Sequence, residues 1–209
     1  MGKMKTLNVV LGLLFFGSLW GIFEASFGDW LYSNGITHPS IYLTTIALVI
    51  LASSKVFLPY KWTGSLIGLI ATLFKLVNIP FFACHLLAIF LFGVGFDIAY
   101  GLISRIYSGK FRMPVIGLVG TYTGRALFAV IITYVVQYKY WTAVGLPRVI
   151  DYIFISGSIA TLFGIIAVPV GDYIGKRVRK LSWPELHPQY STMAVLMSIL
   201  CIWIIQKAI

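Results

Sequence analysis

Long apolar runs, separated by short polar segments, make up most of the chain. A membrane-spanning helix needs about 20 mainly apolar residues, whereas the strands of a membrane β-barrel are segments of about ten residues with alternating polarity. The runs here are longer and continuously apolar, so they predict an all-α, polytopic transmembrane helix bundle. Six spans are expected, at residues 7–28, 40–58, 63–79, 83–106, 114–137 and 151–175.

A seventh apolar run covers residues 191–206. At 1.5 Å per residue its helix would reach about 24 Å, against a hydrocarbon core of about 30 Å. The run therefore either crosses a thinned bilayer with little tilt or lies partly at the interface. Its length leaves both alternatives open.

The composition agrees with a membrane protein. Of the 209 residues, 59% are hydrophobic and 11% are charged, whereas a soluble domain carries about 25% charged residues. These values exclude a soluble globular enzyme. The net charge of +10 does not indicate nucleic-acid binding, because such binding needs basic residues clustered on a soluble face. No repeat, linker or low-complexity segment divides the chain, so residues 1–209 are expected to form a single integral membrane domain.

The positive charges predict how the spans are oriented. Cytoplasmic loops of membrane proteins are enriched in lysine and arginine. With the N-terminus inside, eleven cations fall on the cytoplasmic side and three on the outer side. The inner set is Lys3, Lys5, Lys55, Lys61, Arg105, Lys110, Arg112, Lys176, Arg177, Arg179 and Lys180, and the outer set is Lys139 and Arg148, with Lys207 if the seventh run crosses. A multi-pass protein of the cell (plasma) membrane with a cytoplasmic N-terminus is therefore expected.

Four ionisable residues fall well inside the predicted spans, where a charged side chain costs about 2.5–3.5 kcal/mol on insertion scales. Pairing with an opposite charge would lower this cost, and the two ion pairs hypothesised are Glu24–Lys75 and Asp97–Arg125. Lys75 has an alternative, because a long cationic side chain also reaches the interface by itself.

Polar and aromatic residues gather toward the predicted outer side. The segments 33–40 and 137–150, with the turn at residues 78–80, are expected to roof an outward-facing pocket for a small molecule. The candidate binding residues are Cys84, His85, Lys75, Asn78, Glu24, Asp29, Trp30, Tyr138 and Trp141. For the aromatic residues, an interfacial belt is the alternative, and for Cys84 it is simple packing.

Small residues recur every four positions in the first predicted helix, at Gly17, Gly21 and Ala25. This spacing lets two helix backbones approach closely within a membrane. The stripe is either a contact inside the bundle or a docking face for another membrane protein, and the sequence leaves both open.

Motifs of several enzyme classes are missing from the sequence. It contains no Walker A loop, no metalloprotease His-Glu pattern and no nucleophile elbow. The chain is therefore not expected to hydrolyse ATP or to pump by itself. Two classes of function that stay open are a membrane enzyme or electron-transfer subunit that uses Cys84, His85, Glu24 and Asp97, and a purely structural subunit.

The stretch from Gly64 to Pro80, with Gly68 and Lys75, and the helix that follows it through Gly93, Asp97 and Gly101, resemble a known family. They are similar to the substrate-binding S components of energy-coupling factor (ECF) vitamin transporters. The resemblance implies a six-helix protein that captures a vitamin near its outer side, by binding and not as an enzyme. It also implies a membrane coupling subunit, docked on Gly17, Gly21 and Ala25, and two ATPase subunits that supply the energy.

Cobalamin-specific members of this family place a cysteine near the third loop as a cobalt ligand. The resemblance therefore implies that Cys84 would bind the cobalt of a transported corrinoid, while the chain holds no cofactor of its own. Cobalamin is the leading expectation for the ligand, and thiamine, riboflavin and biotin are alternatives that fit the same fold.

Overall fold

The computed structural model describes residues 6–78, 83–181 and 188–208, and every regular element in these ranges is a helix. The α-helices are α1 (Thr6–Ile22), α2 (Gly28–Ser33), α3 (Pro39–Phe57), α4 (Thr63–Asn78), α5 (Ala83–Ile106), α6 (Arg112–Val130), α7 (Lys139–Thr142), α8 (Leu146–Ile150), α9 (Ser156–Leu181) and α10 (Pro188–Ala208). Three π-helical segments interrupt them, namely η1 (Phe23–Phe27), η2 (Ile131–Val135) and η3 (Asp151–Ile155).

Five continuous helical segments are long and apolar enough to cross a membrane. They are Thr6–Ser33, Pro39–Phe57, Ala83–Ile106, Arg112–Val135 and Leu146–Lys180. The predicted all-α class is confirmed, and each of these segments corresponds to a predicted span. The other two predicted runs correspond to shorter apolar helices, Thr63–Val77 and Val195–Lys207. Six spans and a cytoplasmic N-terminus therefore stay predictions.

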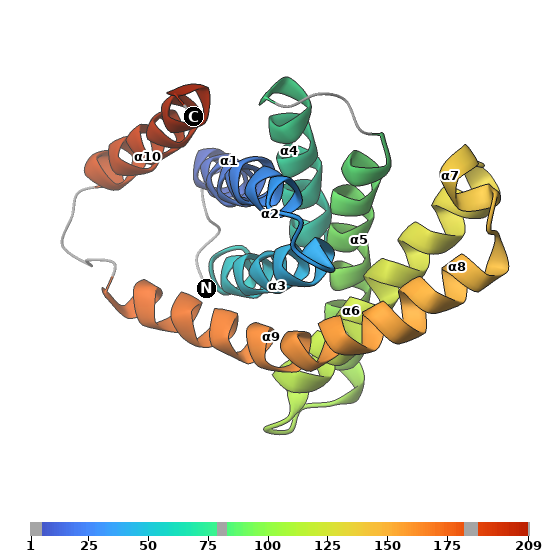
Figure 1. The fold of residues 1–209 in the computed structure, drawn as a ribbon. Coiled ribbons are helices and arrows are strands. Elements are labelled where there is room, and N and C mark those ends of the chain that lie inside the picture. Colours follow the sequence, from blue (N-terminus) through green and yellow to red (C-terminus); the bar gives the residue numbers. More distant parts are fainter. Residues whose placement is uncertain (1–5, 79–82, 182–187, 209) are drawn as a thin grey trace.

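The helices pack around a core of fully buried side chains. Figure 1 shows α4 between α1 and α5, and α9 lying across α3 and α6. Leu48, Leu51, Ile67, Phe96, Ile116 and Val168 are all 0% exposed at the centre. The C-terminal helix α10 lies beside α1 at the edge of the molecule (Figure 1), where Trp203 donates a hydrogen bond to Ser18 (3.1 Å) and Ser26 donates one to Gln206 (2.7 Å).

The small-residue stripe of α1 faces α4 in the same chain. A Cβ atom added to Gly17 would lie 2.5 Å from Ile70, and one added to Gly21 would lie 2.6 Å from Phe74. Ala25 in η1 is 0% exposed. The stripe therefore makes a close contact inside the bundle, and the docking face expected on these three residues is not accessible to a partner in this structure.

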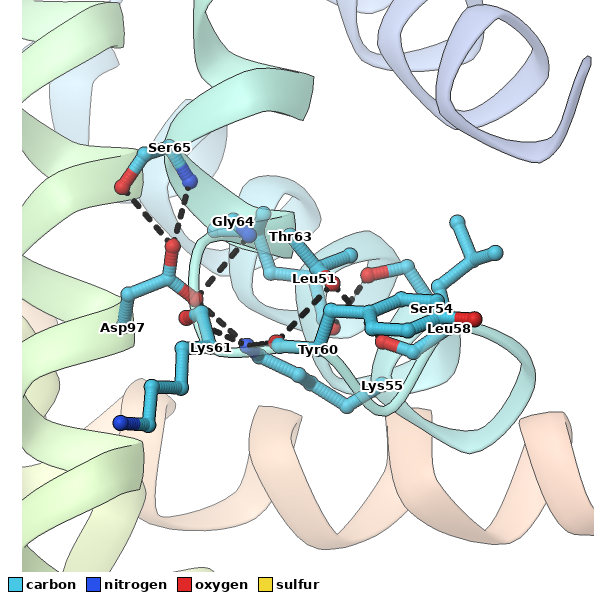
Figure 2. A network of polar contacts seen from close by, with 10 residues as sticks. All are labelled: Leu51, Ser54, Lys55, Leu58, Tyr60, Lys61, Thr63, Gly64, Ser65 and Asp97. Carbon is cyan, nitrogen blue, oxygen red and sulfur yellow. Dashed lines mark hydrogen bonds and ion pairs between the residues drawn. The ribbon is translucent and has the colours of Figure 1, made fainter. Parts of the chain in front are cut away.

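A buried polar cluster joins α3, α4 and α5 (Figure 2). Lys55 in the last turn of α3 pairs with Asp97 of α5 at 2.6 Å, and both side chains are almost fully buried. The Asp97 carboxylate also accepts hydrogen bonds from the backbone amides of Gly64 (3.0 Å) and Ser65 (2.6 Å) and from the Ser65 hydroxyl (2.8 Å). These amides open α4, so Asp97 supplies the acceptor that the first turn of that helix lacks.

The predicted Asp97–Arg125 pair is therefore wrong. Lys55, expected as a loop cation, is instead 5% exposed, and its ammonium also donates to the backbone carbonyls of Tyr60 (2.8 Å) and Lys61 (3.2 Å). The side chain holds the α3–α4 turn against α5, as Figure 2 shows. Its charge is neutralised by Asp97, so Lys55 adds little to the cationic bias on its side of the bundle.

Candidate small-molecule site

A cavity of about 460 Å³ lies at the end of the bundle where α3 and α5 begin. Aromatic and aliphatic side chains form most of its wall, and charged or polar groups project among them. The apolar wall includes Trp20, Leu43, Ala88, Ile89, Phe92, Phe128 and Trp141, and the polar groups include Glu24, Tyr32, His38, Ser40, Lys75, His85, Arg125, Arg148, Asp151, Tyr152 and Ser156. Such a mixture is typical of sites for small organic molecules.

Two of the three π-helical segments contribute to this wall. Glu24 lies in η1 and Tyr152 in η3, and both border the cavity. A π-helical segment adds a residue to a turn and so shifts the direction of the side chains around it, and such segments are frequent at functional sites. The helix geometry is therefore irregular where the site is built.

Glu24 and Lys75 form the ion pair that the sequence predicts. Their charged atoms lie 3.4 Å apart, and both side chains are about nine-tenths buried. Trp20 donates a second hydrogen bond to the Glu24 carboxylate, at 3.2 Å. The pair joins η1 to α4 at the cavity wall and leaves little free charge there.

Replacing Lys75 with Met is expected to lower the free energy of unfolding by about 1.5 kcal/mol, the lower end of the range for a hydrogen bond to a charged group, because Glu24 loses its charged partner but keeps the Trp20 donor. Thermal unfolding of the purified protein in detergent measures this change. The exchanged pair Glu24→Lys with Lys75→Glu should recover part of the loss. Lys110→Met, at an exposed turn, is the control. No recovery in the exchanged pair would contradict a functional ion pair.

Arg125 of α6 is the most deeply buried cation of the cavity wall, with 1% of its surface exposed. One terminal nitrogen, Nη1, donates to the Tyr152 carbonyl and the Ser156 hydroxyl, each at 3.1 Å, and Nη2 donates to the Ser40 hydroxyl at 3.2 Å. The guanidinium also stacks on the Tyr152 ring at 4.5 Å. Residues from α3, η3 and α9 thus hold one side chain of α6 in place.

His85 lies against Tyr32, and both residues border the cavity. Their rings are stacked with centroids 5.2 Å apart, and the Tyr32 hydroxyl lies 3.5 Å from His85 Nε2. Cys84 is half-buried beside them and also borders the cavity. Within the described ranges, no three His, Cys, Asp or Glu side chains come together in a way that could hold a metal ion.

The segment between α6 and α9 forms another side of the site. Gly145 adopts a positive φ of 67°, a backbone conformation that favours glycine, and so turns the chain between α7 and α8. This turn brings Arg148 back over the rings of Tyr140 and Trp141, at 3.9 and 5.3 Å. Residues of both expected roof segments, 33–40 and 137–150, therefore border the cavity.

The structure brings together five of the nine predicted binding residues, namely Glu24, Lys75, Cys84, His85 and Trp141. Asp29, Trp30 and Tyr138 do not border the cavity and are exposed, Trp30 by 54% and Tyr138 by 38%. Trp30 stacks on Phe27 instead, at 5.7 Å. The side chain of Asn78 and the other two residues of the expected turn, 79 and 80, lie outside the described residues.

Several residues of the cavity wall were not among the predicted binding residues, and Arg125 is the most important of them. The sequence marked it as a cation inside a span, but assigned it to Asp97. Tyr32, His38, Ser40, Tyr140, Arg148, Tyr152 and Ser156 also border the cavity. Tyr140 and Arg148 lie in the expected roof segment 137–150, which was the available signal. Asp97, proposed for the enzyme alternative, does not border the cavity, because it belongs to the Lys55 cluster.

The charged groups of the site are held by hydrogen bonds and ion pairs, and the walls are aromatic. This arrangement suits binding of an amphipathic molecule. Comparisons with protein-family models, with curated proteins and with solved structures give no match.

Proposed function

We propose that this chain is the substrate-binding subunit of an ECF-type importer and captures a small vitamin in its cavity. The observation that carries the proposal is the cavity itself, with about 460 Å³ of space and mixed aromatic and charged walls inside a membrane-type helix bundle. Ligand sites in proteins have volumes of about 300–1,000 Å³ and the same balance of apolar and polar groups.

The distribution of charge supports a cavity that opens to the outside. Arg105 ends α5 and Arg112 begins α6, at the helix ends remote from the cavity, and Arg179 near the end of α9 donates to the carbonyl of Val56 in α3 (2.9 Å). Lysine and arginine favour the cytoplasmic side. An outward-facing cavity and a cytoplasmic cationic end therefore belong to the proposal.

The size of the cavity favours a vitamin with one or two rings, such as biotin, over a complete corrinoid. A second candidate is cobalamin, and the observation that supports it is Cys84 at the cavity wall. A thiolate is a soft ligand suited to an axial position on cobalt. In that case part of the corrinoid would extend beyond the cavity.

Uptake would take its energy from partner proteins, because the sequence has no phosphate-binding loop. A membrane coupling subunit and two ATPase subunits are the partners proposed. Since α4 covers Gly17 and Gly21, the coupling subunit would dock on another surface of the bundle or require α1 and α4 to separate.

Native mass spectrometry of the detergent-purified protein tests the proposal. The wild type is expected to retain a small organic molecule, and Ala88→Trp should abolish its retention by filling the cavity from α5. Leu162→Trp adds the same ring on the outer surface of α9, where the leucine is 66% exposed, and should leave retention unchanged. A corrinoid would be identified by its absorption spectrum, which Cys84→Ala should shift. If Ala88→Trp still retains the molecule, binding in this cavity is contradicted.

A further inference from the structure

Arg125 is a buried cation that has no acidic partner among the described residues. The ion pairs there join Lys55 to Asp97, Lys75 to Glu24 and Lys176 to Asp172. A charge removed from water is stabilised only by an opposite charge or by a full set of hydrogen bonds. The three acceptors around Arg125 are neutral oxygens, so the positive charge itself stays uncompensated.

The hydrogen bonds of Arg125 also leave donors unused. A guanidinium has five N–H donors, and three of them point to Tyr152, Ser156 and Ser40. Nε has no hydrogen-bond partner within the described part of the chain. Nη2 uses one of its two N–H donors, so the guanidinium, which borders the cavity, keeps a donor for the oxygens of a carboxylate or phosphate.

The other charged groups of the wall do not compensate Arg125. Glu24 is taken by Lys75 and Trp20, and Asp151 is exposed at the start of η3. Arg148 brings another positive charge near Tyr140 and Trp141. The wall thus carries three cations, Lys75, Arg125 and Arg148, against two carboxylates.

We infer that the ligand of this cavity carries an anionic group, a carboxylate or a phosphate, that binds at Arg125. The rest of the ligand is an apolar or aromatic body that packs against Phe92, Phe128 and Trp141, which line the same cavity. Arg125 is preorganised for this role because Ser40, Tyr152 and Ser156 fix its position before a ligand arrives. The inference rests on the proposed function, since it names the chemical class of the molecule captured.

Isothermal titration of the full chain in detergent, with three probes that share one ring system, tests the inference. The probes are 1-naphthoate, 1-naphthyl phosphate and the neutral 1-naphthalenemethanol. The wild type is expected to bind at least one anionic probe roughly tenfold to a hundredfold more tightly than the neutral one, as for a charge-assisted hydrogen bond. The stronger of the two anions identifies whether the site prefers a carboxylate or a phosphate.

Two variants connect that preference to Arg125. Arg125→Gln should remove the preference for anions, so that the charged and the neutral probes bind with similar affinity. Arg125→Lys keeps the charge but loses the planar edge, so it should retain a weaker preference for anions. Arg105→Gln, at an exposed position in the last turn of α5, is the control and should bind all probes as the wild type does.

The outcomes separate this inference from the proposed function. Equal binding of charged and neutral probes by the wild type would overturn the inference and leave a binding cavity in place. The same holds if Arg125→Gln folds, by near-UV circular dichroism, and still prefers anions. If the wild type binds none of the probes, the proposed function fails together with the inference.

Discussion

Asp97→Asn is expected to lower the free energy of unfolding by about 3–5 kcal/mol, the usual cost of removing one partner of a buried ion pair. The side chain keeps its shape, but the charge that neutralises Lys55 is lost. The new amide also presents a donor group to the donors of Lys55, Gly64 and Ser65, which now surround a carboxylate. Unfolding in a titration with sodium dodecyl sulfate, followed by circular dichroism, measures the change.

The matched control is Asp172→Asn, which removes an ion pair with a similar distance between its charged atoms but with greater exposure to solvent. Asp172 and Lys176 are separated by 2.6 Å, and the lysine side chain is 59% exposed. An exposed pair at this helical spacing contributes only about 0.3–0.5 kcal/mol. The double variant Lys55→Met with Asp97→Leu should be less destabilised than Asp97→Asn, because no charge is left buried. Equal effects of Asp97→Asn and Asp172→Asn would show that the buried cluster does not stabilise the fold.

Gly117→Ala is expected to lower the free energy of unfolding by about 2–3 kcal/mol, in the upper part of the range for overpacked cores. Gly117 of α6 lies where this helix crosses α9. A Cβ atom added to Gly117 would overlap the backbone carbonyl group of Gly164. The carbonyl carbon of Gly164 would lie only 2.7 Å from this Cβ atom. Because the obstacle is backbone, the two helices must move apart, and the contacts along the crossing are lost. The same detergent titration measures this change.

Gly101→Ala is the control for this substitution, and its effect should have the opposite sign. Gly101 lies on an exposed side of α5, and an added Cβ meets nothing within 4 Å. Alanine there should raise the free energy of unfolding by up to about 1 kcal/mol, since glycine is the weaker helix former. A loss of stability in Gly101→Ala as large as that in Gly117→Ala would mean that the close crossing of α6 and α9 is not the cause.

The approximate positions of the long helices follow from the sequence, because an apolar run of sufficient length in this composition forms a helix, although the helical segment predicted at 151–175 runs from Leu146 to Lys180. The predicted spans 40–58 and 83–106, for example, correspond to Pro39–Phe57 and Ala83–Ile106. The π-helical segments were not predicted. They depend on how neighbouring helices pack, and no local pattern of residues marks where one extra residue enters a turn.

The candidate site was predicted in part, and the errors have one physical origin. Glu24–Lys75 was correct because the two residues lie at the same predicted depth and have opposite charges. Asp97 was assigned to Arg125, the other cation well inside the predicted spans, whereas Lys55 was counted among the cytoplasmic cations. The partner it has is Lys55, because packing of α3 and α4 against α5 brings that ammonium to 2.6 Å.

The sequence by itself determined the helical class of the protein, the approximate positions of its long helices and the scarcity of charge inside them. These properties depend on local composition and on the length of each run. Only the tertiary structure decided which charges meet, that the glycines of α1 face α4, and that Arg125 borders the cavity without an acidic partner among the described residues. Such contacts join residues that are distant in the chain, and their energies depend on distance and burial, which arise only when the helices pack.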